Sequence, residues 1–379
     1  MSLYLDNAAT SYPKPESVYQ AVLHTMREIG ASPGRGGYGR SLEAGRLLFQ
    51  TREVAAALFS VPDSSRIIFT HSTTESLNTA LRGTLSDGDH VITTSMEHNS
   101  LIRPLQALRE RGVGLTFVTA ASDGRVDPDD IRRALTPKTR MIACAHVSNV
   151  SGTIQPIELI AKIARQAEVL FLLDAAQSAG SIPIDVASIG IDLLAVPGHK
   201  GLYGPQGTGL LAVAPGVALR PLLAGGTGSN STSEEQPNSF PDGFEAGTHN
   251  LPGIAGLKAG MEFVLEQGAT IIGGHERNLV KIARDALEGL PGLTLYGSAD
   301  QSVCAGVLSC AARGKDAASL AFELDQRFDI AVRAGLHCAP RAHQTLGSFP
   351  AGTVRMSPGW FSTREDIALF ARAVVECLR

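Results

Sequence analysis

The chain has 379 residues, of which 44% are hydrophobic, and its formal net charge is −4 at pH 7. This length predicts one large and one smaller domain, and the weak negative charge without a basic stripe argues against nucleic acid as a partner. No apolar run reaches the length of a membrane span and the N-terminus lacks the basic region of an export signal, so we expect a cytoplasmic protein without membrane association.

The first half of the sequence predicts an α/β domain. Helices are expected over residues 16–29 and 42–59, where apolar residues recur with helical spacing. From residue 66, short apolar runs alternate with helical segments, which is typical of a mostly parallel sheet covered by helices. Strands are expected at 66–70, 90–94, 115–119, 140–145, 169–173 and 193–196, and at 207–213 as an edge strand.

Polar side chains follow the ends of five predicted strands. Because the carboxyl ends of parallel strands meet at one edge of a sheet, we expect these side chains to line one site. They are Thr73 and Thr74, His98, Asn149, Asp174 with Gln177, and His199 with Lys200. Hydroxyl groups at a helix start, such as Thr73 and Thr74, form a ready anion site, although plain helix capping would use the same residues.

Asp174 and Lys200 indicate the cofactor. Each follows an apolar run that reads as a buried strand, so neighbouring strands deliver an acid and an amine to the same crevice. This pair suits pyridoxal phosphate (PLP), with Lys200 forming the Schiff base and Asp174 holding the ring nitrogen protonated. The alternative is a surface ion pair. Glycines and a proline around Lys200 favour the cofactor site, because they form a tight turn that a ligand can approach closely.

The composition shifts after residue 213. Residues 225–247 are rich in Gly, Ser, Asn and Pro, and a loop of this length is usually functional or disordered. Beyond it we expect a smaller C-terminal α+β domain with helices at 254–267, 274–290 and 317–327, strands at 293–296, 303–309 and 330–333, and a last helix from about Arg364. Ser362 and Glu365 are the expected capping box of that last helix. The predicted divisions are an N-terminal segment packing on the small domain (1–20), a large domain (21–252) and a small domain (253–379).

Cys338 is the candidate nucleophile. The cysteines form no CxxC pair or metal-ligand spacing, so we expect reduced thiols at Cys144, Cys304, Cys310, Cys338 and Cys377. Only Cys338 is predicted on a loop beside cationic residues, which favour the reactive thiolate, whereas the alternative is an inert loop thiol. His337 or His343 could shuttle protons, and we expect His343 at the surface.

Arg355 is the candidate ligand for a substrate carboxylate. It lies in a predicted short strand before a turn, and its guanidinium can hold a carboxylate through two parallel hydrogen bonds. The alternative is an ordinary surface arginine.

Motifs spread over the whole chain carry a family resemblance. In chain order they are DNAAT, STTES, MEHNS, HVSNVSGT, DAAQS, PGHKGLYGPQGTG, FEAGT, RAGLHCA and TVRMSPGWFST. As a set they resemble the class V aminotransferase family of fold-type I PLP enzymes, and within it the cysteine desulfurases. The short interval between Cys338 and Arg355 resembles the SUF-type, or type II, branch more than the branch with a long mobile cysteine loop.

The resemblance implies the fold-type I architecture, a homodimer and a role for each matching residue. Lys200 would bond covalently to the cofactor, Asp174 would pair with the pyridine nitrogen, and Gln177 would reach the ring hydroxyl. His98 would stack on the ring. The phosphate would be held by Thr73, Thr74 and His199, with Thr248 reaching the phosphate of the other subunit.

The resemblance also implies the reaction. Asn149 and Arg355 would bind the substrate carboxylate, and Cys338 would take the sulfur of L-cysteine as a persulfide and leave L-alanine. The sulfur would pass to an unidentified acceptor protein, as in sulfur mobilisation for iron–sulfur cluster assembly. Selenocysteine lyase, with L-selenocysteine as substrate, and other class V lyases or aminotransferases are the alternatives.

Three residues depart from the SUF-type pattern. Pro197 stands where a serine often contacts the phosphate, Tyr38 lies near the position of a histidine, and Leu336 replaces the first histidine of a His-His-Cys run. These departures leave open which subgroup the chain belongs to and which protein accepts the sulfur. They do not affect the expected PLP chemistry. A binding scaffold without activity would be expected to lose Lys200 or Asp174, and both are present.

Overall fold

The structure is a computed structural model that describes residues 3–34, 36–228 and 232–379. The first two residues of the predicted N-terminal segment, Arg35, and part of the predicted long loop lie outside the described residues.

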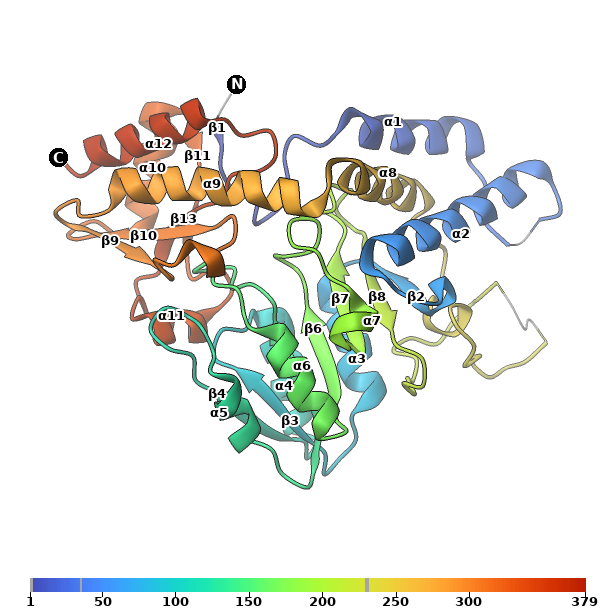
Figure 1. Ribbon diagram of the computed structural model, residues 1–379. Helices are drawn as coiled ribbons and strands as arrows, with labels where there is room; N and C mark the ends of the chain where they lie inside the picture. The colour runs from blue at the N-terminus through green and yellow to red at the C-terminus, as the bar shows by residue number, and fades with distance from the viewer. Residues whose placement is uncertain (1–2, 35, 229–231) are drawn as a thin grey trace.

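A seven-stranded sheet forms the centre of the larger part of the molecule (Figure 1). The strand order is β2-β8-β7-β6-β5-β3-β4, and all neighbours pair in parallel except β8, which is antiparallel to β2 and β7. The strands are β2 (Ile67–Thr70), β3 (His90–Thr94), β4 (Gly114–Val118), β5 (Thr139–Ala145), β6 (Leu170–Asp174), β7 (Leu193–Pro197) and β8 (Gly209–Val213). The predicted mostly parallel α/β sheet is confirmed.

The prediction that residues 207–213 form an edge strand is wrong. The strand in this stretch, β8, lies between β7 and β2, and the edges of the sheet are β2 and β4. An antiparallel neighbour needs no crossover helix, so the chain turns back through residues 198–208, and β8 pairs with β7 on one side and with β2 on the other.

Helices cover both faces of this sheet, which explains why its strands read as continuous apolar runs. Successive residues point to opposite faces, so Leu172 packs with α3 and α4, whereas Leu173 packs with α2 and α6. The helical elements of this part are α1 (Glu16–His24) with the π-helical turn η1 (Thr25–Ile29), α2 (Gly39–Phe59), η2 (Ser64–Arg66), α3 (Thr73–Thr84), α4 (Asn99–Arg109), α5 (Pro128–Arg133), α6 (Ile157–Gln166), α7 (Val186–Ile189), η3 (Asp242–Phe244) and α8 (Leu251–Gln267).

The smaller part is built on a four-stranded antiparallel sheet of order β12-β13-β10-β9. Its core is separate from that of the larger part and includes Leu308, Leu324 and Phe370. The elements are α9 (Ala269–Leu287), β9 (Leu293–Tyr296), η4 (Gln301–Val303), β10 (Leu308–Ala312), α10 (Ala317–Phe328), β11 (Ile330–Ala331), β12 (Arg333–Gly335), α11 (Pro340–Leu346), β13 (Thr353–Met356) and α12 (Arg364–Cys377).

Two strands of this smaller part differ from their predicted bounds. The strand expected at 303–309 is β10, which begins only at Leu308. The strand expected at 330–333 is divided into β11 and β12, because β11 pairs with the N-terminal strand β1 (Leu3–Tyr4) while β12 joins the small sheet. The second difference depends on a partner far away in sequence, because β1 lies at the other end of the chain from β11.

The last helix begins at the expected residue but with a different cap. Thr363 is the N-cap: its side chain accepts a hydrogen bond from the Asp366 N–H, and the Asp366 carboxylate accepts one from the Thr363 N–H. The capping box predicted at Ser362 and Glu365 is therefore wrong by one residue. Helix α11 was not predicted, because seven residues are too few to show a helical period.

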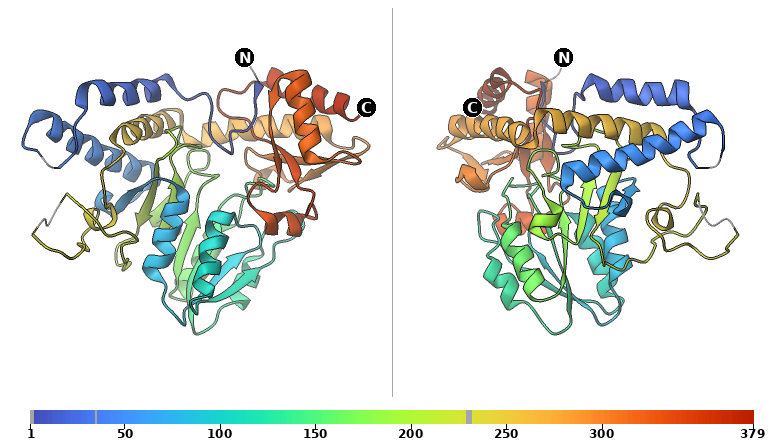
Figure 2. Two further views of the ribbon diagram at one scale, coloured as in Figure 1. Left: turned by 180° about the vertical axis from the view of Figure 1, so that it is seen from behind. Right: turned by 45° about the vertical axis from the view of Figure 1, so that its right-hand side comes forward.

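The division into domains remains a prediction, and two features bear on it. The N-terminal strand β1 pairs with β11 of the smaller part. Helix α8 extends beyond residue 253, but Leu257 and Met261 on it belong to the core of the larger part, next to α1 and α2. Figure 2 shows α1 and α2 on the opposite side of the molecule from the small sheet. Among the described residues, no helix combines the length and apolar character needed to cross a membrane.

Candidate active site

A cavity of about 290 Å³ lies at the carboxyl ends of β3, β5, β6 and β7. The predicted site residues that line it are Thr73, Thr74, His98, Asn149, Asp174, Gln177, His199, Lys200 and Cys338. Arg333, on β12, lines it as well, so the smaller part of the molecule contributes one wall. Parallel strands thus gather the polar groups in space as their positions in the sequence predict.

Asp174 and Lys200 enter this cavity from neighbouring parallel strands. Asp174 is only 3% exposed, which excludes a surface ion pair, and burial raises its pKa to about 6 although the nearby Lys200 opposes the shift. Burial lowers the pKa of Lys200 to about 8, so its amine is readily deprotonated for attack on an aldehyde. A side chain at Gly201 would collide with the Ala179 carbonyl, which explains the glycine after the lysine.

His98 is held as a neutral ring. It caps α4, and its Nδ1 accepts a hydrogen bond of 3.0 Å from the Ser100 N–H. Burial lowers the pKa of His98 to about 4, with the charge of Lys200 acting in the same direction. Because Nδ1 is an acceptor, the single ring proton sits on Nε2, and the fixed ring is suited to stacking.

The start of α3 forms one end of the cavity and is suited to an anion. Thr73 Oγ1 and His199 Nδ1 are both buried and have no hydrogen-bond partner among the described residues. A buried polar atom without a hydrogen-bond partner destabilises the fold, so each of these two atoms is suited to form a hydrogen bond with a group that is bound there. Burial lowers the pKa of His199 to about 4, so it is neutral. With the acid, the amine and the neutral ring of His98, these groups fit PLP.

The N-terminal segment lies against the cavity and lines it with Ala9, a place that the sequence did not predict. The Ser11 N–H and the Thr10 hydroxyl donate to the His199 carbonyl at 3.1 and 3.0 Å. Gln177 Nε2 donates to the Ala8 carbonyl at 3.0 Å. These bonds place residues 8–11 against the turn that carries Lys200. The only sequence signal for this was the DNAAT match.

Arg355 is a buried residue, so the alternative of a surface arginine is wrong. It is 1% exposed, Nη1 donates to the Asn149 carbonyl at 3.1 Å, and Nη2 pairs with the Asp6 carboxylate at 2.6 Å. Arg355 does not itself line the cavity, but its contact with Asn149 places it directly behind the lining. Asp6 is a second site residue that the sequence did not reveal.

Cys338 is the accessible thiol. Its side chain is exposed, and Arg333 Nη2 donates to its sulfur at 3.7 Å. The other four cysteines are buried, and burial raises their pKa values, to about 12 for Cys310. The expected surface position of His343 is wrong: it is fully buried, with Nδ1 bonded to Ser348 Oγ at 2.7 Å.

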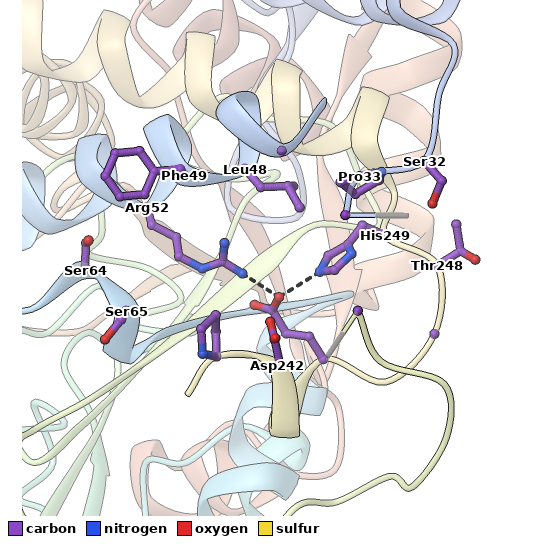
Figure 3. A pocket seen from close by; sticks show the side chains of 16 residues that line it. Ser32, Pro33, Leu48, Phe49, Arg52, Ser64, Ser65, Asp242, Thr248 and His249 are labelled. Atoms are coloured by element: carbon purple, nitrogen blue, oxygen red, sulfur yellow. Dashed lines mark hydrogen bonds and ion pairs between the residues drawn. The ribbon is translucent and has the colours of Figure 1, made fainter. Parts of the chain in front are cut away.

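Thr248 lies away from these groups, beside a second cavity of about 260 Å³ (Figure 3). It is exposed, and the loop that carries it is fixed by Glu245, which pairs with Arg52 at 2.5 Å and His249 at 2.7 Å. Because it does not line the cavity of Lys200, a role of Thr248 at a phosphate requires a second subunit.

An amine and an acid lie at the carboxyl edge of a mostly parallel sheet, beside a helix start whose buried hydroxyl is suited to an anion. This is the arrangement of a fold-type I enzyme. The family model described as "Aminotransferase class-V" matches residues 3–370. The chain therefore belongs to the class-V aminotransferase family.

Within this family its relatives are cysteine desulfurases. It is 37% identical over 380 residues to a probable cysteine desulfurase of Methanothermobacter thermautotrophicus, covering 99% of this chain and 94% of that one. The structure of a cysteine desulfurase from Thermococcus onnurineus NA1 matches with a TM-score of 0.93, 32% identity and coverage of 100% and 94% of the two chains. The cysteine desulfurase CsdA from Escherichia coli matches with a TM-score of 0.90, 29% identity and the same coverage.

Proposed function

We propose that this chain is a PLP-dependent cysteine desulfurase that converts L-cysteine to L-alanine and keeps the sulfur as a persulfide on Cys338. The observation that carries the proposal is that Cys338, the exposed cysteine of the five, lines the same cavity as Lys200 and Asp174. A transaminase of this fold would have no use for an exposed thiol at that position.

The lining residues hold the cofactor in this proposal. Asp174 binds the pyridine nitrogen, Gln177 the ring hydroxyl and His98 the ring face, while Lys200 supplies the covalent link. The phosphate is bound by Thr73, Thr74 and His199, whose unpartnered buried atoms support that role. The bound cofactor supplies an electron sink for the substrate Cα.

The substrate is held between Cys338 and Asn149, with Arg355 directly behind Asn149. Arg355 and Asn149 bind the α-carboxylate and orient the amino acid, and Lys200 moves the proton at Cα. The Cys338 thiolate attacks the substrate sulfur, so that one S–S bond forms and one C–S bond breaks. The electron pair of the broken bond stays on carbon, where a proton completes alanine, and no external oxidant is required.

Incubation of the purified protein with L-cysteine, L-selenocysteine or L-alanine tests the function. We expect alanine and protein-bound sulfur from cysteine in equal amounts in the first turnover. Keto acid formed from alanine would instead identify an aminotransferase, and cleavage of selenocysteine alone would identify a selenocysteine lyase. We further propose that the enzyme is cytoplasmic and that the sulfur serves iron–sulfur cluster assembly. The exposed Cys338 is open to a partner, which supports transfer of the sulfur to an acceptor protein.

Arg355→Ala should raise KM for cysteine strongly and lower kcat less, because a carboxylate ligand acts in both the ground state and the transition state. Loss of a hydrogen bond to a charged group, worth about 1.5–3 kcal/mol, corresponds to roughly a 10- to 150-fold change. Steady-state kinetics measure it. Arg327→Ala, at an exposed ion pair on α10, is the control. An unchanged KM in Arg355→Ala would rule out the carboxylate role.

We also propose that the enzyme is a homodimer in which Thr248 reaches the phosphate of the other subunit. Large apolar side chains are exposed on neighbouring elements of one side, at Leu23, Met26, Leu42 and Phe49. Phe49 lines the same cavity as Thr248, so this apolar surface adjoins the residue to be shared. Closed two-fold pairs are the commonest oligomers.

Phe49→Glu should therefore shift the protein toward monomer and lower its PLP content, since the charge would be buried in the subunit contact. Light scattering and absorbance measure the two effects. Phe322→Glu is the matched control, because Phe322 on α10 is 65% exposed against 61% for Phe49. A wild-type protein that is monomeric and fully active would contradict the dimer.

A further inference from the structure

The turn that carries Cys338 has an unusual backbone. His337 and Cys338 have φ values of +47° and +58°, in the left-handed region that residues with a Cβ rarely occupy. Two such residues in succession persist only where the surrounding structure fixes them. The Ala339 N–H closes the turn on the Leu336 carbonyl at 2.8 Å.

The larger part of the molecule holds this turn through hydrogen bonds to the backbone carbonyl groups of the turn. Asn149 Nδ2 donates to the His337 carbonyl at 2.7 Å, and the Asn99 N–H donates to the Cys338 carbonyl at 2.8 Å. Asn99 opens α4 directly after His98, and Asn149 follows β5. These two hydrogen bonds therefore fix the peptide groups of the turn relative to the elements that line the cofactor cavity.

The smaller part pins the same turn through the His337 side chain. The imidazole is 3% exposed, and its Nε2 shares a hydrogen bond of 3.0 Å with Thr353 Oγ1 on β13. The buried ring of His343 lies against it, with the ring centroids 5.5 Å apart. Burial lowers the pKa of His337 to about 2, so the ring is neutral near neutral pH.

We propose that His337 is a positioning residue: its buried bond to Thr353 holds the left-handed turn, so that Cys338 is fixed against the cavity rather than carried on a mobile loop. His337 touches neither substrate nor cofactor in this role. The inference rests on the proposed function of Cys338 as sulfur acceptor, and it assigns to His337 a structural task in place of the proton shuttling that the sequence left open.

Three variants separate these roles. His337→Leu and Thr353→Val each remove the hydrogen bond, and Thr353→Val does so with little change in shape. His337→Gln keeps a donor and an acceptor near Nε2 but cannot titrate. We expect His337→Leu and Thr353→Val to lower the single-turnover rate of persulfide formation on the order of 10- to 100-fold, because misplacing a reacting atom by about 1 Å costs that much. KM should change less than about twofold.

His337→Gln should retain most of the rate with an unchanged pH profile. Hydrogen exchange of residues 336–339, measured without substrate, should rise in His337→Leu and Thr353→Val but not in His337→Gln. Thr345→Val is the matched control, because the Thr345 hydroxyl bonds to Ser95 and not to the turn.

An equal loss of rate in His337→Gln and His337→Leu, with a shifted pH profile, would overturn the proposal in favour of proton transfer. Wild-type rates and exchange in Thr353→Val would overturn it as well. Failure of the desulfurase proposal is recognised separately, by retained activity in Cys338→Ala, since the exchange measurement does not depend on sulfur chemistry.

Discussion

Replacing Cys338 with alanine should abolish persulfide formation and lower alanine production from cysteine by roughly 10³-fold or more, as removal of a nucleophile does in other enzymes. Sulfur leaves carbon poorly as a free anion, so a second thiolate has to accept it. Cys338 alone combines exposure with a guanidinium, that of Arg333, directed at its sulfur. Selenocysteine, which has a better leaving group, should still be cleaved to a larger extent than cysteine.

The variant should retain the cofactor spectrum and its change on adding cysteine, because Cys338 does not hold the cofactor. Mass spectrometry after a short cysteine pulse should find the added sulfur on the peptide of Cys338 in the wild-type protein. Cys377→Ala, which removes a buried thiol of α12, is the control. Sulfur on a buried cysteine, or full activity in Cys338→Ala, would move the assignment to a different PLP lyase.

Residues at strand ends were predictable because the rule that places them is local. Asp174 ends one apolar run and Lys200 closely follows another, and parallel strands bring their carboxyl ends to one edge without further information. The order of strands is not local in this sense. Residues 207–213 were expected at an edge, yet β8 lies inside the sheet, because β2 pairs with it from more than a hundred residues earlier in the chain.

Burial of single polar residues outside periodic segments was not predictable. Arg355 and His343 lie in short elements that show no period, and both are fully enclosed. The ion pair of Arg355 with Asp6 joins positions 349 residues apart. The N-terminal segment has little hydrophobic pattern, so its place beside the cavity depends on hydrogen bonds with His199 and Gln177 that only the folded chain reveals.

Lys200→Ala should remove the covalent attachment of PLP and with it desulfurase activity. Lys200 is placed to form the link because it follows β7, whose neighbour β6 carries Asp174 at the same edge of the sheet. Burial lowers the pKa of Lys200 to about 8. Above that pH the amine is mostly neutral and nucleophilic, whereas below it protonation increasingly blocks attack. Loss of its proton transfer at Cα alone costs about 10²–10⁴-fold. Borohydride reduction followed by mass spectrometry of the intact chain measures the attachment.

Lys14 is the natural control, because burial also lowers its pKa to about 8 and its ammonium lies close to the same turn, bonded to the Ser11 carbonyl at 3.1 Å. A low pKa alone therefore does not identify Lys200 as the cofactor lysine. Its position in the cavity does. Lys14 belongs to the N-terminal segment and is not among the residues that line the cavity. Lys14→Ala should thus keep the reducible link, and Lys200→Ala should lose it. Reduced cofactor still attached to Lys200→Ala would show that another amine reaches the site, and the assignment of β7 as the carrier of the cofactor lysine would be wrong.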